Sequence, residues 1–353
     1  MRVLMTLLLK RKTENYKTNL KNRPMKKIAI NGMGRIGRAA LKVILDTPEL
    51  DVVAVNDLVP VDNIAYLLKY DSVYGIYEKE VTHDENHLII DGKKINYYSN
   101  RNPEELPWKE DNIEIVIEST GFFTNSKDAA KHITAGAKTV VISAPTKSED
   151  TPTVVHGVNS EEGKTSIFSC ASCTTNNISP VVEVLGRRIG IQKAIMTTVH
   201  AYTASQNMVD SVSKKNYRMG RAGAANIVPT STGAAIATTK ALPQYKGKFD
   251  GVALRVPIPV GSISDMTFVT EKPVTVEEIN TILQEEAQTA RYTNVLATTH
   301  EPIVSSDIVK SPYASTVDLS MTRVVDGDLL KVMTWYDNEW GFTNQMIRQI
   351  LEI

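Results

Sequence analysis

In the first half of the chain, short apolar runs alternate with stretches of helical periodicity. The apolar runs predict strands over residues 28–30, 52–55, 113–117 and 139–142. Apolar positions three and four residues apart predict helices over residues 39–45 and 127–135. Continuous apolar strands that alternate with helices are typical of a parallel sheet covered on both faces, so we expect a doubly wound α/β domain. Residues 69–92 are more polar and predict an insertion with antiparallel strands.

After residue 173 the pattern changes. Strands are predicted over residues 194–199, 251–257, 264–270, 315–325 and 329–336. Helices are predicted over residues 276–288 and 341–353, and residues 205–223 are expected to form an ordered loop. We therefore expect a second, α+β domain with a mixed or antiparallel sheet.

A glycine-rich motif follows the first predicted strand. Residues 32–37 read Gly-Met-Gly-Arg-Ile-Gly, a helix pattern follows, and the next strand ends at Asp57, about 20 residues beyond the last glycine. The order of strand, GxGxxG, helix, strand and acidic residue is typical of a Rossmann-type dinucleotide-binding domain. Gly32 would let backbone amides approach a pyrophosphate, and Asp57 would accept hydrogen bonds from a ribose diol. The alternative is a structural glycine turn with a solvated aspartate.

Both cysteines of the chain lie close together, at Cys170 and Cys173. A strand-like run over residues 165–168 precedes them and a helical pattern follows, so Cys173 is expected near a helix N-terminus. The helix dipole and free amides there favour a thiolate. The alternatives are a small buried apolar residue, which is the commoner role of a free cysteine, or a reversible disulfide with Cys170.

The residues around Cys173 bear on two further expectations. Thr174, Thr175 and Asn176 are candidate caps of the helix, because their side-chain oxygens can accept from free amides. A zinc site is not expected, because the chain has no second cysteine pair and no histidine close by in sequence. We expect no metal in this protein.

Composition narrows the classes of partner. The 353 residues include 40 basic and 40 acidic side chains, so the formal net charge is zero. A neutral balance argues against a dedicated nucleic-acid surface and against electrostatic membrane binding. Two cysteines in a chain of this length indicate a reducing compartment, and a cytoplasmic location is expected. The length suggests two domains, and no apolar run is long enough to span a bilayer.

The first 24 residues differ from the rest. A short apolar run is followed at once by Lys10, Arg11 and Lys12, where a secretory signal would carry small residues. We expect residues 1–24 to be a disordered extension or sequence upstream of a true start at Met25. A weak targeting peptide is a further alternative.

Six motifs together resemble phosphorylating glyceraldehyde-3-phosphate dehydrogenases. They read NGMGRIGR at residues 31–38, ASCTTN at 171–176, TVHAYT at 198–203, STGAA at 231–235, RVP at 255–257 and WYDNEWG at 335–341. They occur in the family's order and cover the chain from about residue 26 to its C-terminus. The resemblance therefore includes everything except the N-terminal extension.

The resemblance implies a reaction. Cys173 would be the nucleophile that adds to an aldehyde to give a hemithioacetal, and His200 would be the base. Hydride transfer to NAD would leave a thioester, which inorganic phosphate would attack to release an acyl phosphate. His200 follows Cys173 by 27 positions (200 − 173), so only the fold can bring them together. A lone histidine is also commonly a structural residue.

The resemblance also implies binding residues. Thr203 and Arg255 match the site for the substrate phosphate; Ser172, Thr174, Thr232 and the amide of Gly233 match the site for inorganic phosphate, which Arg221 helps to hold. Hydroxyls, helix-start amides and guanidinium groups suit phosphate oxygens, although such residues more often cap helices or lie at the surface. The expected cofactor-binding residues are Gly32, Arg35, Ile36, Asp57, Thr120, Gly121, Ser143 and Asn338, of which Asn338 matches the residue that holds the nicotinamide carboxamide.

The expected cofactor is NAD, because Asp57 would repel the 2′-phosphate of NADP. Ser211 and Val212 stand where strictly NAD-dependent members often have a proline-containing pair, so some use of NADP stays open. In the family this loop lies near the adenosine ribose of a neighbouring subunit.

These inferences combine into one hypothesis. We expect a homotetramer that oxidises D-glyceraldehyde 3-phosphate to 1,3-bisphosphoglycerate with NAD and phosphate. The expected parts are an NAD-binding domain (residues 25–172), a catalytic and phosphate-binding domain (173–338) and a C-terminal helix (339–353) that packs back on the NAD-binding domain. The alternatives are an erythrose-4-phosphate dehydrogenase and a non-catalytic, redox-sensing NAD-binding protein.

Overall fold

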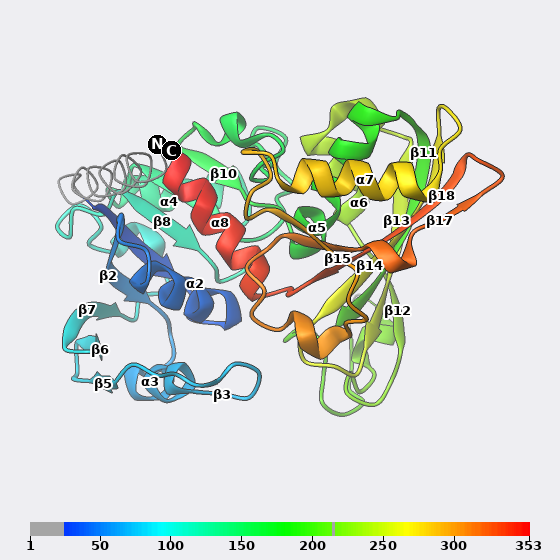
Figure 1. The fold of residues 1–353 in the computed structure, drawn as a ribbon. Helices are drawn as coiled ribbons and strands as arrows, with labels where there is room; N and C mark the ends of the chain where they lie inside the picture. The colour runs from blue at the N-terminus through cyan, green and yellow to red at the C-terminus, as the bar shows by residue number, and fades with distance from the viewer. Residues whose placement is uncertain (1–24, 214–215) are drawn as a thin grey trace, which may run out of the picture.

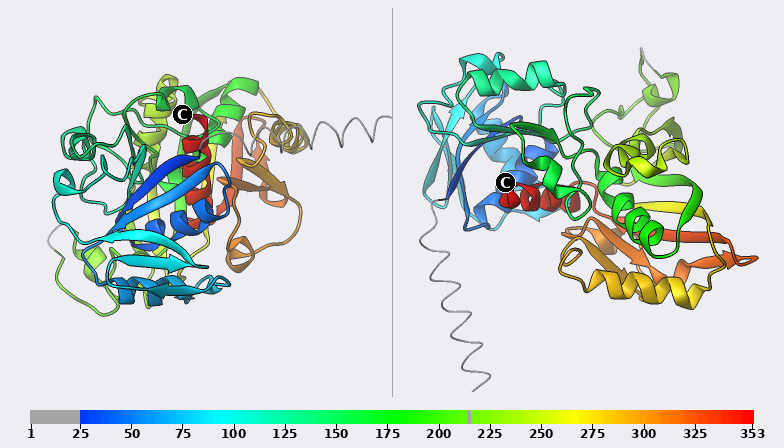
Figure 2. Two further views of the ribbon diagram at one scale, coloured as in Figure 1. Left: turned by 90° about the vertical axis from the view of Figure 1, so that its left-hand side faces the viewer. Right: turned by 90° about the horizontal axis from the view of Figure 1, so that it is seen from above.

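The computed structural model describes residues 25–213 and 216–353. The predicted N-terminal extension, residues 1–24, lies outside the described residues. Two sheets with their helices lie side by side, one built from the blue to blue-green strands and one from the green to orange strands (Figure 1; Figure 2). None of the helices in the described ranges has both the length and the apolar content needed to cross a membrane.

The first sheet has eight strands. They are β1 (Lys26–Asn31), β2 (Leu50–Asn56), β5 (Val81–His83), β6 (His87–Ile90), β7 (Lys93–Tyr98), β8 (Ile115–Glu118), β9 (Thr139–Ile142) and β10 (Ile167–Ser169). Their order is β10-β9-β8-β1-β2-β7-β6-β5, parallel from β10 to β7 and antiparallel over β5, β6 and β7. The predicted doubly wound α/β fold is confirmed.

Helices and one small hairpin complete this part of the molecule. The helices are α2 (Arg35–Leu45), α3 (Val61–Lys69), α4 (Ser126–Thr134) and the C-terminal α8 (Trp340–Glu352), and the hairpin pairs β3 (Tyr70–Asp71) with β4 (Gly75–Ile76). Ile28 and Ile30 of β1 are fully buried in a cluster that also contains Leu41 of α2 and Met346 and Ile350 of α8. The C-terminal helix therefore shares its core with the first sheet, and Figure 1 shows α8 in red beside α2.

The second sheet is mixed. Its strands are β11 (Ile191–Ala201), β12 (Val228–Ser231), β13 (Phe249–Val256), β14 (Ser262–Thr270), β15 (Leu296–Thr299), β16 (Ser315–Asp318), β17 (Arg323–Val325) and β18 (Leu329–Tyr336). The order is β12-β13-β11-β14-β18-β16-β15, with β17 paired to β18, and β11 is parallel to β13 but antiparallel to β14. The expected α+β architecture with a mixed sheet is confirmed.

Three helices belong to this second part: α5 (Cys173–Arg188), α6 (Ala234–Ala241) and α7 (Val276–Ala287). Ile178 and Leu185 of α5 share a buried cluster with Met266 and Phe268 of β14. Because β10 belongs to the first sheet and ends at Ser169, the chain passes from one sheet to the other just before α5 begins. Cys173 therefore lies where the two parts of the molecule meet.

Most predicted elements differ from the structure by one to four residues at their ends, and one predicted strand is divided. The strand predicted over residues 165–168 is β10, which starts two residues later. The run predicted as one strand over residues 315–325 is two strands, because a short 3-10 helix over Leu319–Met321 separates β16 from β17. Asp318 accepts a hydrogen bond from the amide of Ser320 (3.2 Å) and so favours this turn over a continuous strand.

Candidate active site

The glycine-rich turn joins β1 to the start of α2. Gly32 has φ +97°, and a Cβ at this position would lie 2.7 Å from the amide nitrogen of Thr120. Gly34 caps α2, and a Cβ there would meet no protein atom within 4 Å. The first turn of α2 carries no acidic residue, and the first amides of a helix lack intrahelical partners. The turn thus presents a free helix start that suits an anion.

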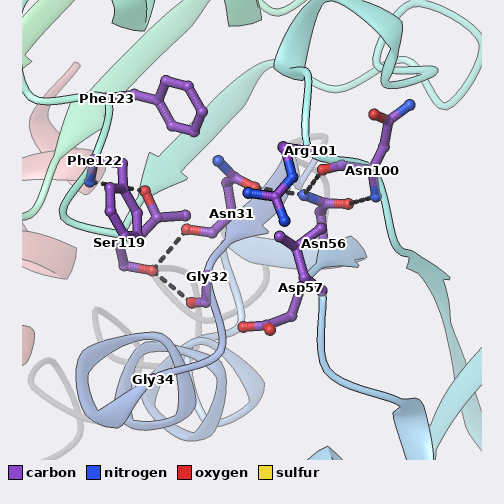
Figure 3. A pocket seen from close by; sticks show the side chains of 12 residues that line it. Asn31, Gly32, Gly34, Asn56, Asp57, Asn100, Arg101, Ser119, Phe122 and Phe123 are labelled. Atoms are coloured by element: carbon purple, nitrogen blue, oxygen red, sulfur yellow. Dashed lines mark hydrogen bonds between the residues drawn. The ribbon is translucent and has the colours of Figure 1, made fainter.

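A cavity of about 510 Å³ opens beside this turn, at the carboxyl ends of the parallel strands (Figure 3). Its lining residues are Asn31, Gly32, Gly34, Asn56, Asp57, Leu58, Asn100, Arg101, Ser119, Thr120, Phe122 and Phe123. This is where open parallel sheets bind their ligands. Phe122 is 82% exposed and offers an aromatic ring to a planar group.

Asp57 is held in place by the backbone around it. Its Oδ2 accepts from the amide of Met33 (2.6 Å) and its Oδ1 from the amide of Val59 (3.0 Å). Each carboxylate oxygen has further acceptor capacity, so a ribose diol can still donate to it. The glycine turn, the cavity and this oriented carboxylate fit the pyrophosphate and adenosine ribose of a dinucleotide.

The predicted cofactor residues divide into two groups. Gly32, Asp57 and Thr120 line the cavity, whereas Arg35, Ile36, Gly121, Ser143 and Asn338 are not among its lining residues. The Arg35 guanidinium donates to Asp71 (2.6 Å) and to Glu339 (2.9 Å from Nε). Those carboxylates orient the Arg35 side chain, and its backbone amide lies in the first turn of α2, where a phosphate would bind.

Asn338 has a defined orientation. Its Oδ1 accepts from the amide of Gly261 (3.2 Å) and the hydroxyl of Ser262 (3.0 Å), and the residue is 5% exposed. Its amide nitrogen therefore points away from these partners.

Sequence reasoning missed several lining residues of the cavity. Asn100 and Arg101 follow β7, and Phe122 and Phe123 follow β8 shortly after Thr120. Their position just after a strand of the parallel sheet could have identified these residues as part of the cavity. For β7 that position was hard to recognise, because the strand comes directly after the antiparallel insertion.

The second group of predicted residues surrounds the start of α5. Cys173 is the first residue of this helix, and its N-cap is Ser172, whose Oγ accepts from the amide of Thr175 (3.0 Å). The prediction that Thr174, Thr175 or Asn176 caps the helix is therefore wrong. The cap lies one residue before the cysteine, which leaves Cys173 in the first turn.

Cys173 and His200 meet. The Cys173 Sγ lies 3.4 Å from Nε2 of His200, which is on β11 and 4% exposed. Strand β11 pairs with β13 so that His200 is opposite Arg255. The helix start and the two neighbouring strands thus bring three of the predicted residues together.

Nδ1 of His200 has two close polar neighbours. It lies 2.7 Å from the carbonyl oxygen of Ala201, which can only accept, and 2.5 Å from Nη1 of Arg255, which can only donate. When the hydrogen is on Nδ1, Nε2 directs its lone pair at the Cys173 sulfur. Burial and the charge of Arg255 lower the pKa of His200 to about 3, so the imidazole is neutral at neutral pH. A neutral imidazole with a free lone pair can accept a proton from the thiol.

The thiol differs from the sequence-based expectation. Burial raises the pKa of Cys173, while Arg255 and the hydroxyl and amide of Thr174 lower it in opposition. The backbone amides at the helix start lower the pKa of the thiol, as predicted, but burial outweighs them and the net direction is upward. The physical reason is the loss of hydration, which a sequence does not reveal.

Arg255 and Thr174 contact this pair in different ways. Nη1 of Arg255 donates to the carbonyl of Ala201 (3.1 Å) and lies 2.5 Å from Nδ1 of His200. The Thr174 hydroxyl pairs with the Tyr336 hydroxyl (2.9 Å), and the Tyr336 ring meets the His200 ring edge-on. Thr174 is buried, so its side chain faces the interior.

The other predicted phosphate ligands have local partners. Thr203 pairs with the hydroxyl of Ser205 (2.9 Å), Thr232 accepts from the amide of Ala234 (3.2 Å), and Gly233 is the N-cap of α6. Arg221 donates to Asp210 (2.8 Å), and both side chains are more than half exposed. Within the described ranges, no hydrogen bond joins these residues to Cys173, His200 or Arg255.

Comparison with known proteins identifies the family. The family model described as "Glyceraldehyde 3-phosphate dehydrogenase, NAD binding domain" matches residues 26–126, and the one described as "Glyceraldehyde 3-phosphate dehydrogenase, C-terminal domain" matches residues 172–338. A glyceraldehyde-3-phosphate dehydrogenase of Zymomonas mobilis is 47% identical over 325 residues, 91% of this chain and 96% of that protein. Glyceraldehyde-3-phosphate dehydrogenase 1 of Bacillus subtilis is 46% identical over 324 residues, with the same shares covered.

The chain belongs to the glyceraldehyde-3-phosphate dehydrogenase family. Its cofactor is NAD, as the family's NAD-binding domain and the fit of the cavity both indicate. The resemblance seen in the six sequence motifs is confirmed.

Proposed function

We propose that this chain catalyses the phosphorylating oxidation of D-glyceraldehyde 3-phosphate to 1,3-bisphosphoglycerate. The observation that carries the proposal is the Cys173 thiol at the start of α5, 3.4 Å from the neutral imidazole of His200. A nucleophile within reach of a base is what covalent catalysis on an aldehyde requires. The family membership supplies the substrate class.

The proton steps follow from the two side chains. As the Cys173 sulfur adds to the aldehyde carbon, its proton passes to Nε2 of His200 and then to the new oxyanion, which gives the hemithioacetal. Nε2 next accepts the hydroxyl proton while hydride leaves the carbon, and a thioester remains on Cys173. Bound NAD supplies the acceptor for that hydride. Phosphate attacks the thioester carbon, and the sulfur leaves and recovers its proton from His200.

For the two phosphates we assign the residues predicted from the sequence. Thr203 and Arg255 would hold the substrate phosphate, and Arg255 is supported by its place beside His200. Ser172, Thr174, Arg221, Thr232 and the amide of Gly233 would hold inorganic phosphate. Gly233 is supported by its position as the N-cap of α6, because backbone amides at a helix start suit an anion.

Three wider proposals accompany this one. The enzyme would act as a homotetramer in the cytoplasm, with no role for membranes or nucleic acid. Gly32, the amides of Arg35 and Ile36, Asp57, Thr120, Gly121, Ser143 and Asn338 would bind NAD, with NADP used less well. The domain boundaries at residues 25, 173 and 339 stay predictions.

Initial-rate kinetics test the reaction. Turnover of glyceraldehyde 3-phosphate with NAD should require phosphate or arsenate as the acyl acceptor, and His200→Gln should lower kcat by about a hundredfold or more. Turnover that does not depend on an acceptor would refute the proposal. Faster turnover of erythrose 4-phosphate than of the triose would favour that alternative substrate, and inactivity towards both would favour a binding protein.

A further inference from the structure

A chain of buried polar side chains lies behind the cavity wall, and the reaction described above does not use it. Glu118 is the last residue of β8 and His132 lies on α4; they are 1% and 0% exposed. A carboxylate buried to this degree needs hydrogen-bond donors that replace water. The identity of those donors shows what the carboxylate holds in place.

Four donors surround the carboxylate of Glu118. Its Oε1 accepts from the amide of Thr120 (2.8 Å) and from the Thr120 hydroxyl. Its Oε2 accepts from Nδ2 of Asn31 (2.6 Å) and lies 3.1 Å from Nε2 of His132. Two partners on each oxygen fill the acceptor capacity of a carboxylate, which can accept but not donate.

Trp108 determines which nitrogen of His132 carries the hydrogen. The indole Nε1 of Trp108 lies 3.0 Å from Nδ1 of His132, and an indole nitrogen can only donate. Nδ1 therefore accepts, and in the neutral ring the hydrogen is on Nε2, where it donates to Glu118. The Trp108 and His132 rings are stacked, with centroids 6.3 Å apart and planes inclined at 25°. Trp108 thus fixes both the tautomer of His132 and the orientation of its ring plane.

The other side of the network is the cavity wall. Asn31 and Thr120 both line the cavity, and Oδ1 of Asn31 accepts from Nδ2 of Asn56 (2.7 Å). Asn56 in turn exchanges two hydrogen bonds of 2.9 Å with the backbone of Asn100. Figure 3 shows Asn31, Asn56 and Asn100 along one side of the pocket. Each of these side chains is oriented by its hydrogen bond to the previous one, and the series begins at Glu118.

This cavity is the adenosine side of the NAD site. Asp57, at the position where such domains bind the adenosine ribose, lines it together with the exposed ring of Phe122. Cys173 and His200 are not among its lining residues, so the reacting half of the cofactor lies elsewhere.

We propose that Glu118 is a positioning residue for the adenosine half of NAD, oriented by His132 and Trp108 and acting through Thr120 and Asn31. The proposal rests on NAD as the cofactor and not on the identity of the aldehyde. It separates the roles of two carboxylates at the ends of β2 and β8, the two strands that flank β1: Asp57 contacts the ligand, and Glu118 shapes the wall.

Glu118→Gln is the direct test, because it keeps the size of the side chain but sets an NH₂ group against donors that need an acceptor. We expect the dissociation constants of NAD and of ADP-ribose to rise by the same factor, about tenfold. Both can be measured by isothermal titration without turnover, so the result does not depend on the proposed reaction. The value of kcat at saturating NAD should stay within about twofold of wild type. Glu114→Gln, a half-buried carboxylate just before β8, is the matched control and should leave both dissociation constants unchanged.

Trp108→Phe tests the far end of the network and keeps most of the packing. Imidazole ¹⁵N spectra should change from a single Nε2–H tautomer of His132 to a mixture, and ADP-ribose affinity should fall by about threefold. A purely structural role would lower the melting temperature but leave the affinity of the folded protein unchanged. Glu118→Gln binding ADP-ribose within about twofold of wild type would overturn the proposal. If that variant does not fold, an unchanged tautomer and affinity in Trp108→Phe would overturn it instead.

Discussion

At the scale of single residues, a thiol, an imidazole and a guanidinium share one largely buried site. Burial opposes ionisation of Cys173 and protonation of His200, and the positive charge of Arg255 favours a thiolate but disfavours an imidazolium. The resting pair is therefore neutral, and the proton moves only as the sulfur attacks. Arg255 is the one group of the three that changes the acidity of both others.

The pH dependence of alkylation tests this picture. Because burial raises the pKa of Cys173, its alkylation by iodoacetamide should accelerate from about pH 6 to about pH 9, as the thiolate fraction rises. Arg255→Gln removes the charge that opposes burial, so it should slow alkylation at every pH. Arg323→Gln, an exposed arginine that donates to backbone carbonyls, is the control and should have no effect. The rate constant is followed by mass spectrometry.

Two outcomes would contradict this prediction. A rate that is constant between about pH 6 and pH 9 would mean that Cys173 is already ionised. Labelling of Cys170 as fast as that of Cys173 would mean that burial does not govern the reactivity of the two thiols, since burial also raises the pKa of Cys170.

Single residues also show how far sequence reasoning reached. The motifs point to Cys173 and His200 and to Gly32 and Asp57, and the structure brings each pair into one site. The ion pairs of Arg35 with Asp71 and Glu339 join residues 36 and 304 positions apart in the sequence. No local sequence pattern predicts such contacts. The raised pKa of Cys173 was missed for the same reason, because burial is a property of the assembled chain.

At the scale of elements, the glycine turn before α2 shows the clearest link from conformation to binding. Gly32→Ala would strain a left-handed backbone and bring its Cβ within 2.7 Å of the Thr120 amide nitrogen. We expect NAD affinity to fall by about tenfold or more in titrations of protein fluorescence. Gly75→Ala has similar backbone strain, with φ +80°, but meets no atom within 4 Å. It should lower the melting temperature and leave NAD binding intact; equal effects of the two variants on affinity would contradict the prediction.

A second prediction at this scale concerns the N-cap of α5. Ser172→Ala removes the acceptor for the Thr175 amide and should cost about 1 kcal/mol of stability in denaturant unfolding. It should also lower kcat, because the first turn of α5 carries Cys173. Thr275→Ala removes the equivalent cap of α7, where the side chain accepts from Glu278. The control should lose similar stability and retain its kcat, and a parallel loss of kcat would exclude a specific role for Ser172.

Most elements could be predicted because their apolar periodicity is strong. The strand over residues 139–142 and the strand over 329–336 have the predicted bounds, and the helices over 127–135 and 276–288 differ by a residue or so at their ends. Helix α3 was not predicted, because only Ile64, Ala65 and Leu68 of its nine residues are buried and its apolar face is short. The break between β16 and β17 depends on a hydrogen bond to the side chain of Asp318, and the apolar periodicity of the sequence does not reveal it.

At the scale of the whole molecule, the second sheet exposes two apolar side chains on the face away from its helices. Ile195 on β11 and Val252 on β13 are 62% and 51% exposed. Their strands are paired so that Thr197 lies opposite Val252, and because Ile195 is two residues from Thr197, the two apolar side chains share one face. Helices α5, α6 and α7 pack on the sheet through the buried cluster that contains Met266 and Phe268. A second copy of the chain would cover the exposed side chains, as the proposed homotetramer requires.

Light scattering tests the assembly directly. The wild-type protein should have a mass about four times 39.0 kDa, and Ile195→Glu should lower it, because a charge on this face would be buried without a partner. Val325→Glu, on β17 and 59% exposed, is the matched control and should leave the mass unchanged. A wild-type monomer would refute the tetramer, and an unchanged mass in Ile195→Glu would place the interface on another face. Since α5 packs on this same sheet, loss of the interface should also lower kcat.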